Sequence, residues 1–353
     1  MVTETENYIV KSEGRDQKLV FSGLLLFLLS LFILDIFLGS VAINPSEVIT
    51  AIFNNTGSNM ETIIMKFRFP KAITALLVGI ALSLSGLQMQ TVFRNPMAGP
   101  YVLGISSGAS LGVAFVIMGS AASVSPLSLS GSGNWILVGA AWIGAGAVML
   151  LIMFISSRVK DIMTILILGI MLSSGISAIV SIMQYFSNDT LLKAYVIWTM
   201  GSLGNLTSAQ LQVLLLSVSA GVLLSIKTIK MLNALLLGEN YAVSIGLNVR
   251  LSRTIIFACT SILTGSVTAF CGPIGFIGIA VPHIARILFR TSDHKILIPA
   301  TILTGGAIML ASDIISQLPG SDNVLPVNSV TSLIGIPVVI WVILRNQKYS
   351  GFF

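Results

Sequence analysis

Long apolar stretches separated by short polar segments dominate the chain. No Asp, Glu, Lys or Arg occurs between Arg94 and Arg158, and residues 194–226 and 323–344 are also free of charge. The apolar residues do not alternate with polar ones, as VFSGLLLFLLSLFIL over residues 20–34 shows, so the period-two pattern of a membrane β-barrel is missing. About 20 apolar residues in a helix cross the hydrocarbon core of a bilayer. The pattern therefore predicts an α-helical membrane protein.

The expected fold class is all-α, a polytopic integral membrane protein with about ten transmembrane helices. We expect the spans at residues 19–41, 70–91, 100–119, 134–156, 162–186, 208–228, 251–271, 274–290, 296–315 and 328–345. Residues 19–345 would form one membrane domain between an N-terminal tail (1–18) and a C-terminal tail (346–353). Because the tail before the first span is polar, we expect that span to be an uncleaved signal anchor.

The charges predict the orientation of these spans. Ten spans place both tails on one side, together with fifteen of the 19 Lys and Arg residues, whereas Lys66, Arg68, Lys71 and Lys193 fall on the other side. Positively charged residues concentrate in cytoplasmic loops. We therefore expect a multi-pass protein of the cell membrane with both termini in the cytoplasm.

The composition supports the membrane assignment. Apolar residues make up 55% of the chain and charged residues only 9%, and the mean hydropathy is +0.96. A soluble domain carries about 25% charged residues. The 32 glycines fit closely packed membrane helices. The net charge of +6 comes from positive residues that lie mostly on the predicted cytoplasmic side, as the membrane orientation requires, so we expect no nucleic acid partner.

The sequence offers no constellation for catalysis or for metal binding. His283 and His294 are the only histidines, and neither lies in an HExxH or GxSxG motif. The chain also lacks the GxxxxGK[ST] loop that cradles nucleotide phosphates, so ATP with its Mg²⁺ would have to bind a separate subunit. Asp35 and Asp313 lie in or near spans, where a carboxylate is a candidate for proton transport. We expect a protein that is not an enzyme and holds no catalytic residue, metal or cofactor of its own.

The longest segment between spans on the cytoplasmic side lies at about 229–250. Its centre, LNALLLGENYAVSIG, predicts a short helix, a break at Gly238 and a second short helix. Such a segment could lie on the lipid surface or insert into a groove of an ATPase, and the residues alone leave both open.

Four blocks resemble the FecCD permeases, the iron-chelate and vitamin B12 uptake family. They begin with FRFPKAITALLVGIALSLSGLQMQTVFRNPMAGPYVLGISSGASLG, residues 67–112. The others are LGENYAVSIGL (237–247), the stretch from GSVTAFCGPIGFIGIAVPHIAR to MLASDII (265–315), and LPVNSVTSLIGIPVVIWVILR (325–345). The resemblance covers about residues 20–345 and implies the permease subunit of an ATP-binding-cassette (ABC) importer of type II fold, moving a ferric siderophore or similar metal chelate.

The resemblance also implies partners. These are a second permease subunit, identical or paralogous, two cytoplasmic ATPases, and an external substrate-binding (lipo)protein. By position, Arg68 and Lys71 match residues that dock the binding protein, and Asn95 and Met97 match the cytoplasmic gate region. The ATPase-coupling residues would be Leu236, Leu237, Gly238, Glu239, Ala242 and Gly246.

Two positions depart from the family pattern. Val324 and Asn328 stand where the family usually has an acidic residue and a glycine around Leu-Pro, which puts external docking or substrate contacts there in doubt. Haem or cobalamin are alternative substrates for the same machinery. A different class, an ion-coupled secondary transporter that uses Asp313, is a further alternative.

Overall fold

The protein is all helical, as the sequence predicts. A computed structural model describes residues 2–39, 48, 59–119, 133–159, 161–318 and 324–347, and these contain helices and no strands. In chain order the helices are α1 (Val2–Phe37), α3 (Asn59–Ile63), the π-helical turn η1 (Ile64–Arg68), α4 (Phe69–Val92), the 3₁₀ turn η2 (Pro100–Leu103), α5 (Ile105–Ile117), α6 (Gly133–Arg158), α7 (Ile162–Tyr185), α8 (Asp189–Thr199), α9 (Ser208–Lys227), α10 (Ile229–Leu236), α11 (Glu239–Ser244), α12 (Val249–Cys271), α13 (Ile277–Phe289), α14 (His294–Ser316) and α15 (Val327–Gln347).

Every predicted span corresponds to one of these helices, although their lengths differ. Seven helices within the described residues are long and apolar enough to cross a membrane: α1, α4 with α3 and η1, α6, α7, α9, α12 and α14. The apolar parts of α5, α13 and α15 are shorter. The count of ten crossings therefore stays a prediction. Residues 40–41 of the first predicted span and residues 348–353 of the C-terminal tail lie outside the described part.

The boundaries differ from expectation where proline and glycine interrupt the apolar pattern. The span predicted from residue 100 starts as the turn η2, and α5 begins only after Gly104, whose φ is +76°. The span predicted from residue 274 begins at Ile277, after the CGPIG segment. α8 is an additional short helix that the sequence did not predict.

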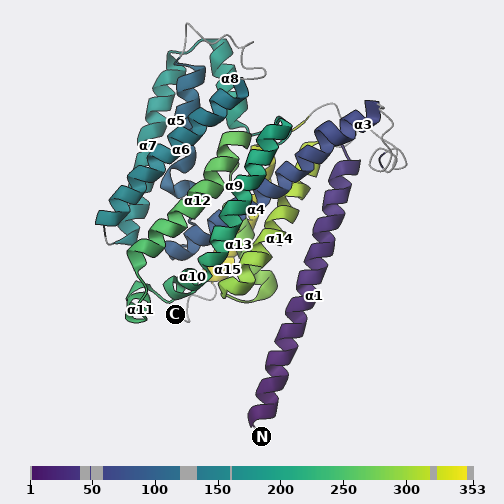
Figure 1. Cartoon of the computed structure of the whole chain (residues 1–353), viewed down its shortest axis with the longest axis vertical. Coiled ribbons are helices and arrows are strands. Elements are labelled where there is room, and N and C mark those ends of the chain that lie inside the picture. Colours follow the sequence, from purple (N-terminus) through teal and green to yellow (C-terminus); the bar gives the residue numbers. More distant parts are fainter. Residues whose placement is uncertain are drawn as a thin grey trace.

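α4 is the centre of the bundle. It packs against α9, α12, α13 and α14, while α5, α6 and α7 form a neighbouring group that joins it through α12 (Figure 1). Glycines bring the backbones together at α4. A Cβ atom on Gly86 would lie 1.6 Å from the carbonyl oxygen of Gly278 in α13. Such close approach of small residues is a general way to pack membrane helices, because lipid supplies no hydrophobic force between them.

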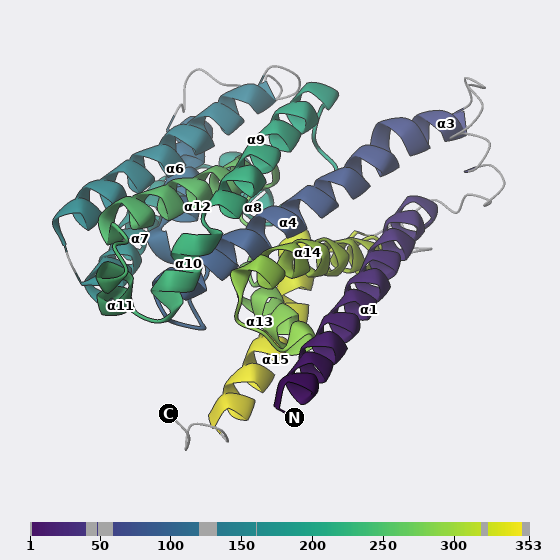
Figure 2. The ribbon, with the colours of Figure 1, turned by 60° about the horizontal axis from the view of Figure 1, so that its bottom comes forward.

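The two ends of the bundle differ in structure. α3 and α8 lie at one end, and α10 and α11 lie at the other, where α1 starts and α15 finishes (Figures 1 and 2). α1 runs along the outside and packs mainly on α14. The end with α10 and α11 is the one that the charge pattern assigns to the cytoplasm.

Candidate functional site

Arg68 lies where η1 leads into α4, at the end of the bundle that the charge pattern predicts to be external. Its guanidinium is largely buried and its Nη1 donates to the carbonyls of Ile36, at 3.1 Å, and Phe37, at 2.8 Å. These carbonyls belong to the last turn of α1, whose carbonyls have no partner within the helix and which carries the negative end of the helix dipole. Arg68 therefore fixes the external end of α1 against α4.

Lys71 belongs to a buried polar network one turn further along α4. Its Nζ lies 3.0 Å from Oδ1 of Asp313, and only a fifth of its side chain is exposed. The amide of Gln317 donates to Oδ2 of Asp313 at 3.1 Å and to Oδ1 of Asp35 at 2.9 Å. The network joins α1, α4 and α14, and it gives the two buried carboxylates shared donors that offset their desolvation.

The predicted docking residues thus have partners inside the chain. Within the basic group Lys66, Arg68 and Lys71, only Lys66 is exposed. Sequence spacing places these residues on the external side but does not reveal that the carbonyls of α1 and the carboxylate of Asp313 bind two of them. Their role in docking stays a prediction.

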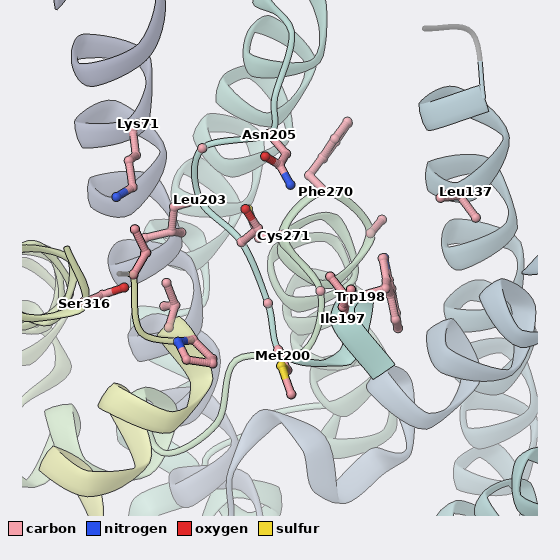
Figure 3. A pocket seen from close by; sticks show the side chains of 18 of the residues that line it. Lys71, Leu137, Ile197, Trp198, Met200, Leu203, Asn205, Phe270, Cys271 and Ser316 are labelled. Carbon is pink, nitrogen blue, oxygen red and sulfur yellow. The ribbon is translucent and has the colours of Figure 1, made fainter. Parts of the chain in front are cut away.

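A pocket of about 520 Å³ opens beside Lys71 at this external end (Figure 3). Lys71 and Ser316 lie on one side of it and Leu137 on the other, with the loop around Met200 between them. Val324, one of the two departures from the family pattern, also lines this pocket.

The second departure, Asn328, has a structural role. Its Oδ1 accepts the backbone N–H of Gly275 at 2.9 Å, and its own N–H donates to Met200 at 3.3 Å. Asn328 therefore ties the start of α15 to the segment before α13. A glycine at this position would provide no acceptor for Gly275.

The predicted gate residues lie in the turn that follows α4. The backbone N–H of Asn95 donates to Gln90, and Asn95 Oδ1 accepts the N–H of Met97 at 2.9 Å, which forms an Asx turn. Met97 is exposed. Pro96 stands between them in the chain, and its carbonyl oxygen is in contact with α13.

α13 holds this gate turn in place. His283 Nε2 lies 2.8 Å from the carbonyl oxygen of Pro96, and Arg286 donates to Oε1 of Gln90 at 2.6 Å. Gln90 in turn donates to the carbonyl of Ile279 at 3.1 Å. The gate turn therefore moves together with α13 or has to break these bonds.

The coupling segment has the predicted form of two short helices with a break at Gly238. α10 ends at Leu236, Gly238 has φ +110°, and α11 begins at Glu239. Positive φ of this size is readily accessible only to glycine. Glu239 forms an ion pair with Arg253 of α12, and Ala242 is fully buried.

The outer surface of this segment is apolar. The exposed side chains at this end of the bundle, which the charge pattern predicts to be cytoplasmic, are those of Leu236, Leu237, Tyr241, Val243 and Ile245, and the backbone of Gly246 is exposed as well. A cluster of exposed apolar side chains of this kind suits contact with a protein partner or with the lipid surface. Of the six predicted coupling residues, Leu236, Leu237 and Gly246 are exposed, Glu239 is partly exposed, and Gly238 and Ala242 are buried.

A second cavity of about 520 Å³ lies between α5, α7, α8 and α15. The described residues that line it include no charged side chain. Six serines contribute hydroxyl groups to its wall, beside apolar side chains: Ser106, Ser107, Ser110, Ser177, Ser181 and Ser332.

The chain is similar to known membrane transport proteins. The FecCD transport family profile matches residues 25–345. The vitamin B12 import system permease protein BtuC of Klebsiella pneumoniae is 35% identical over 92% of this chain and 93% of its own. The hemin transport system permease protein HmuU of Yersinia pestis is 34% identical, over 95% and 98%.

A solved structure of a metal-chelate type ABC transporter in an inward-facing conformation has the same fold. It covers 93% of this chain and 99% of its own, with a TM-score of 0.79 and 25% identity. These relationships do not favour an ion-coupled transporter based on Asp313, which here is bound to Lys71 and Gln317. The chain belongs to the FecCD transport family, as a membrane-embedded permease subunit of an ABC importer.

Proposed function

We propose that this permease imports a ferric siderophore or a similar metal chelate, delivered by an external binding protein. The observation that carries the proposal is the charge-free, hydroxyl-lined cavity between α5, α7 and α15. Hydroxyls bind the oxygen-rich surface of a chelate weakly, and a passage has to release what it binds. The named relatives act on vitamin B12, hemin and a metal chelate, which are all bulky metal complexes.

The substrate class is tested on the whole importer and its binding protein. The binding protein is heated with a ferric hydroxamate, a ferric catecholate, haem or cobalamin, because a ligand at 100 times its Kd stabilises the folded protein by about 2.7 kcal/mol. We expect stabilisation by a ferric siderophore and ATP-dependent uptake of the same compound. Stabilisation by haem or cobalamin alone would assign the importer to that substrate.

On the cytoplasmic side, we propose that α10 and α11 insert into a groove of the partner ATPase. The exposed apolar cluster around Leu237 and Val243 would be buried there, and the ion pair of Glu239 with Arg253 would hold α11 in position. ATP and Mg²⁺ bind the ATPase, so this chain catalyses no chemical step and holds no cofactor. Both termini lie in the cytoplasm with this segment.

The ATPase surface is tested by adding one negative charge to it. Leu237→Asp and Val243→Asp should abolish co-purification of the ATPase, because a carboxylate would be buried in an apolar contact. Ser244→Asp adds the same charge to an exposed polar position of α11 and should leave co-purification intact. ATPase retention by both apolar-site variants would refute this surface.

At the external end, we propose that the basic group of Lys66, Arg68 and Lys71 meets acidic residues of the binding protein. Exposed ion pairs contribute about 0.2–1 kcal/mol each, so the group mainly orients the encounter. Arg68 acts chiefly by holding α1, and Lys66 makes the first contact. Asn95 and Met97 form the cytoplasmic gate at the other end.

The docking proposal is tested at the exposed lysine, where the fold is not disturbed. Lys66→Glu should slow association with the binding protein, and the difference should shrink as salt is raised. Lys193→Glu changes an exposed lysine elsewhere on the external side, in α8, and serves as the control. Equal association rates for both variants at low salt would contradict docking at the basic group.

A further inference from the structure

A chain of hydrogen bonds connects the coupling segment to the end of α4. Asn233 of α10 donates from Nδ2 to Oδ1 of Asp293, at 2.6 Å, and its own Oδ1 lies 2.7 Å from Nδ1 of His294. Nε2 of His294 lies 2.8 Å from the hydroxyl oxygen of Thr91, in the last turn of α4. Three helices therefore meet through four side chains.

The donors and acceptors of this chain fit one arrangement of protons. The backbone N–H of His294 donates to Oδ1 of Asn233 at 2.9 Å, which identifies that atom as the amide oxygen. A carbonyl oxygen only accepts, so Nδ1 of His294 carries the proton and Nε2 of the neutral ring accepts from the Thr91 hydroxyl. The Thr91 hydroxyl also donates to the carbonyl of Leu87 at 2.9 Å, so its one proton is shared between that oxygen and Nε2 of His294.

Burial makes these bonds strong constraints. His294 is completely buried and Thr91 is 2% exposed, so no water can replace a lost partner. Asp293 lies outside the spans at the start of α14, where the backbone N–H of Lys295 lowers the pKa of its carboxyl. The ionised carboxylate is a strong acceptor for the Asn233 amide.

Thr91 stands next to the gate. Its carbonyl accepts the backbone N–H of Arg94 at 3.2 Å, and the gate turn with Asn95 and Met97 follows directly. A displacement of α10 therefore reaches the gate through rigid, directional bonds.

We infer that Asn233 and His294 are positioning residues that transmit movement of the coupling segment to the gate, through Thr91. The inference rests on the proposed attachment of the ATPase to α10 and α11 and specifies how that attachment acts. When the ATPases close and shift α10, His294 pulls on the last turn of α4 and re-orients the turn at Asn95. The guanidinium of Arg94, which would lie 3.4 Å from a Cβ atom on Gly238, offers a second route between the coupling segment and the gate turn.

The experiment uses the complete importer with its ATPases and reads the gate directly, without the substrate. Met97→Cys is introduced as a reporter, and its rate of reaction with a water-soluble maleimide is measured with and without ATP and vanadate. The native cysteines, Cys259 and Cys271, are buried. Thr91→Val removes one hydroxyl and keeps the shape of the side chain, while Thr91→Ser restores the hydroxyl.

We expect the nucleotide-dependent change in labelling to fall about five-fold or more in Thr91→Val, the lower end of typical coupling between sites. Thr91→Ser should recover it, and ATPase activity should persist in both. Thr74→Val is the matched control, because Thr74 is a buried residue of α4 whose hydroxyl donates to the Pro70 carbonyl of its own helix.

The two links can also be cut separately at His294. The amide nitrogen of an asparagine matches Nδ1, so His294→Asn keeps the bond to Asn233 and loses the one to Thr91. The amide oxygen of a glutamine matches Nε2, so His294→Gln does the reverse. Both should lose the gate response, and both decide the question if Thr91→Val does not assemble.

The outcomes separate this inference from the proposed function. If nucleotide leaves labelling unchanged in the reporter importer with the native Thr91 and His294, the attachment of the ATPase to this segment is wrong. If that importer responds and Thr91→Val, or both His294 variants, respond equally, the transmission through His294 is refuted while the proposed function stands.

Discussion

The contact between Gly86 of α4 and Gly278 of α13 makes a quantitative prediction. A Cβ atom on Gly86 would lie 1.6 Å from the Gly278 oxygen, and that neighbour is backbone, which cannot rotate away. An ordinary carbon–oxygen contact is at about 3.3 Å, so Gly86→Ala requires the helices to separate by about 1.7 Å at this point. Separation on this scale also forfeits dispersion contacts along the α4–α13 interface.

Overpacking of this kind costs about 1–3 kcal/mol, and a backbone clash belongs at the upper end. At about 2 °C per kcal/mol for a large chain, Gly86→Ala should lower the melting temperature by about 5 °C. The measurement is thermal unfolding of the purified importer in detergent, followed by gel filtration of the importer that remains assembled. The separation should also weaken the contact between Gln90 and Arg286 and so impair transport.

Gly139→Ala is the control, because nothing lies within 4 Å of the added Cβ in α6. Alanine is the better helix former by roughly 0.5–1 kcal/mol, so this variant should be as stable as the natural protein or more so. If Gly86→Ala melts at the same temperature as Gly139→Ala and takes up substrate normally, the argument from close packing is refuted.

Three further predictions concern individual polar residues. Lys71→Met should destabilise the permease by about 3–5 kcal/mol because it leaves a buried carboxylate unpaired, while the double variant with Asp313→Leu should recover most of the loss in thermal unfolding. Asn328→Gly removes the acceptor of the part-buried Gly275 N–H before α13 and should cost about 1 kcal/mol in the same assay. The side-chain hydroxyl of Thr164 lowers the pKa of the Asp161 carboxyl in the folded protein. The ionised carboxylate therefore stabilises the fold at pH values above its unfolded pKa of about 4, and this stabilisation disappears as the pH falls through the lower pKa of the folded protein. Asp161→Asn should therefore flatten the acid side of the melting-temperature profile between pH 5 and the lower pKa, measured against the natural protein.

Periodic and compositional features of the sequence predicted most of the fold. Apolar stretches located the helices, and Gly238 between two short amphipathic segments located the break between α10 and α11. Helix starts were less predictable at η2 and before α13, where proline and glycine shorten the helix although the residues stay apolar.

The candidate site was predictable by position but not by contact. The charge pattern placed Arg68 and Lys71 on the external side, yet burial against α1 and Asp313 depends on partners far away in the sequence. The same holds for Asn233, in the middle of α10, and His294, at the start of α14, which are ordinary polar residues until the fold brings them together. Sequence spacing carries no information on such long-range pairs.

The bond between Asp35 and Gln317 has a consequence for biosynthesis. The two residues are separated by 282 positions, and Gln317 follows the ninth of the ten predicted spans. At about 5–20 residues per second, a ribosome adds that length in roughly 15–60 s. During this interval α1 lies in the membrane while the carboxyl group of Asp35 lacks Gln317 as its partner. A chain truncated before α14 would therefore expose this unpaired carboxyl group to the quality-control proteases of the membrane.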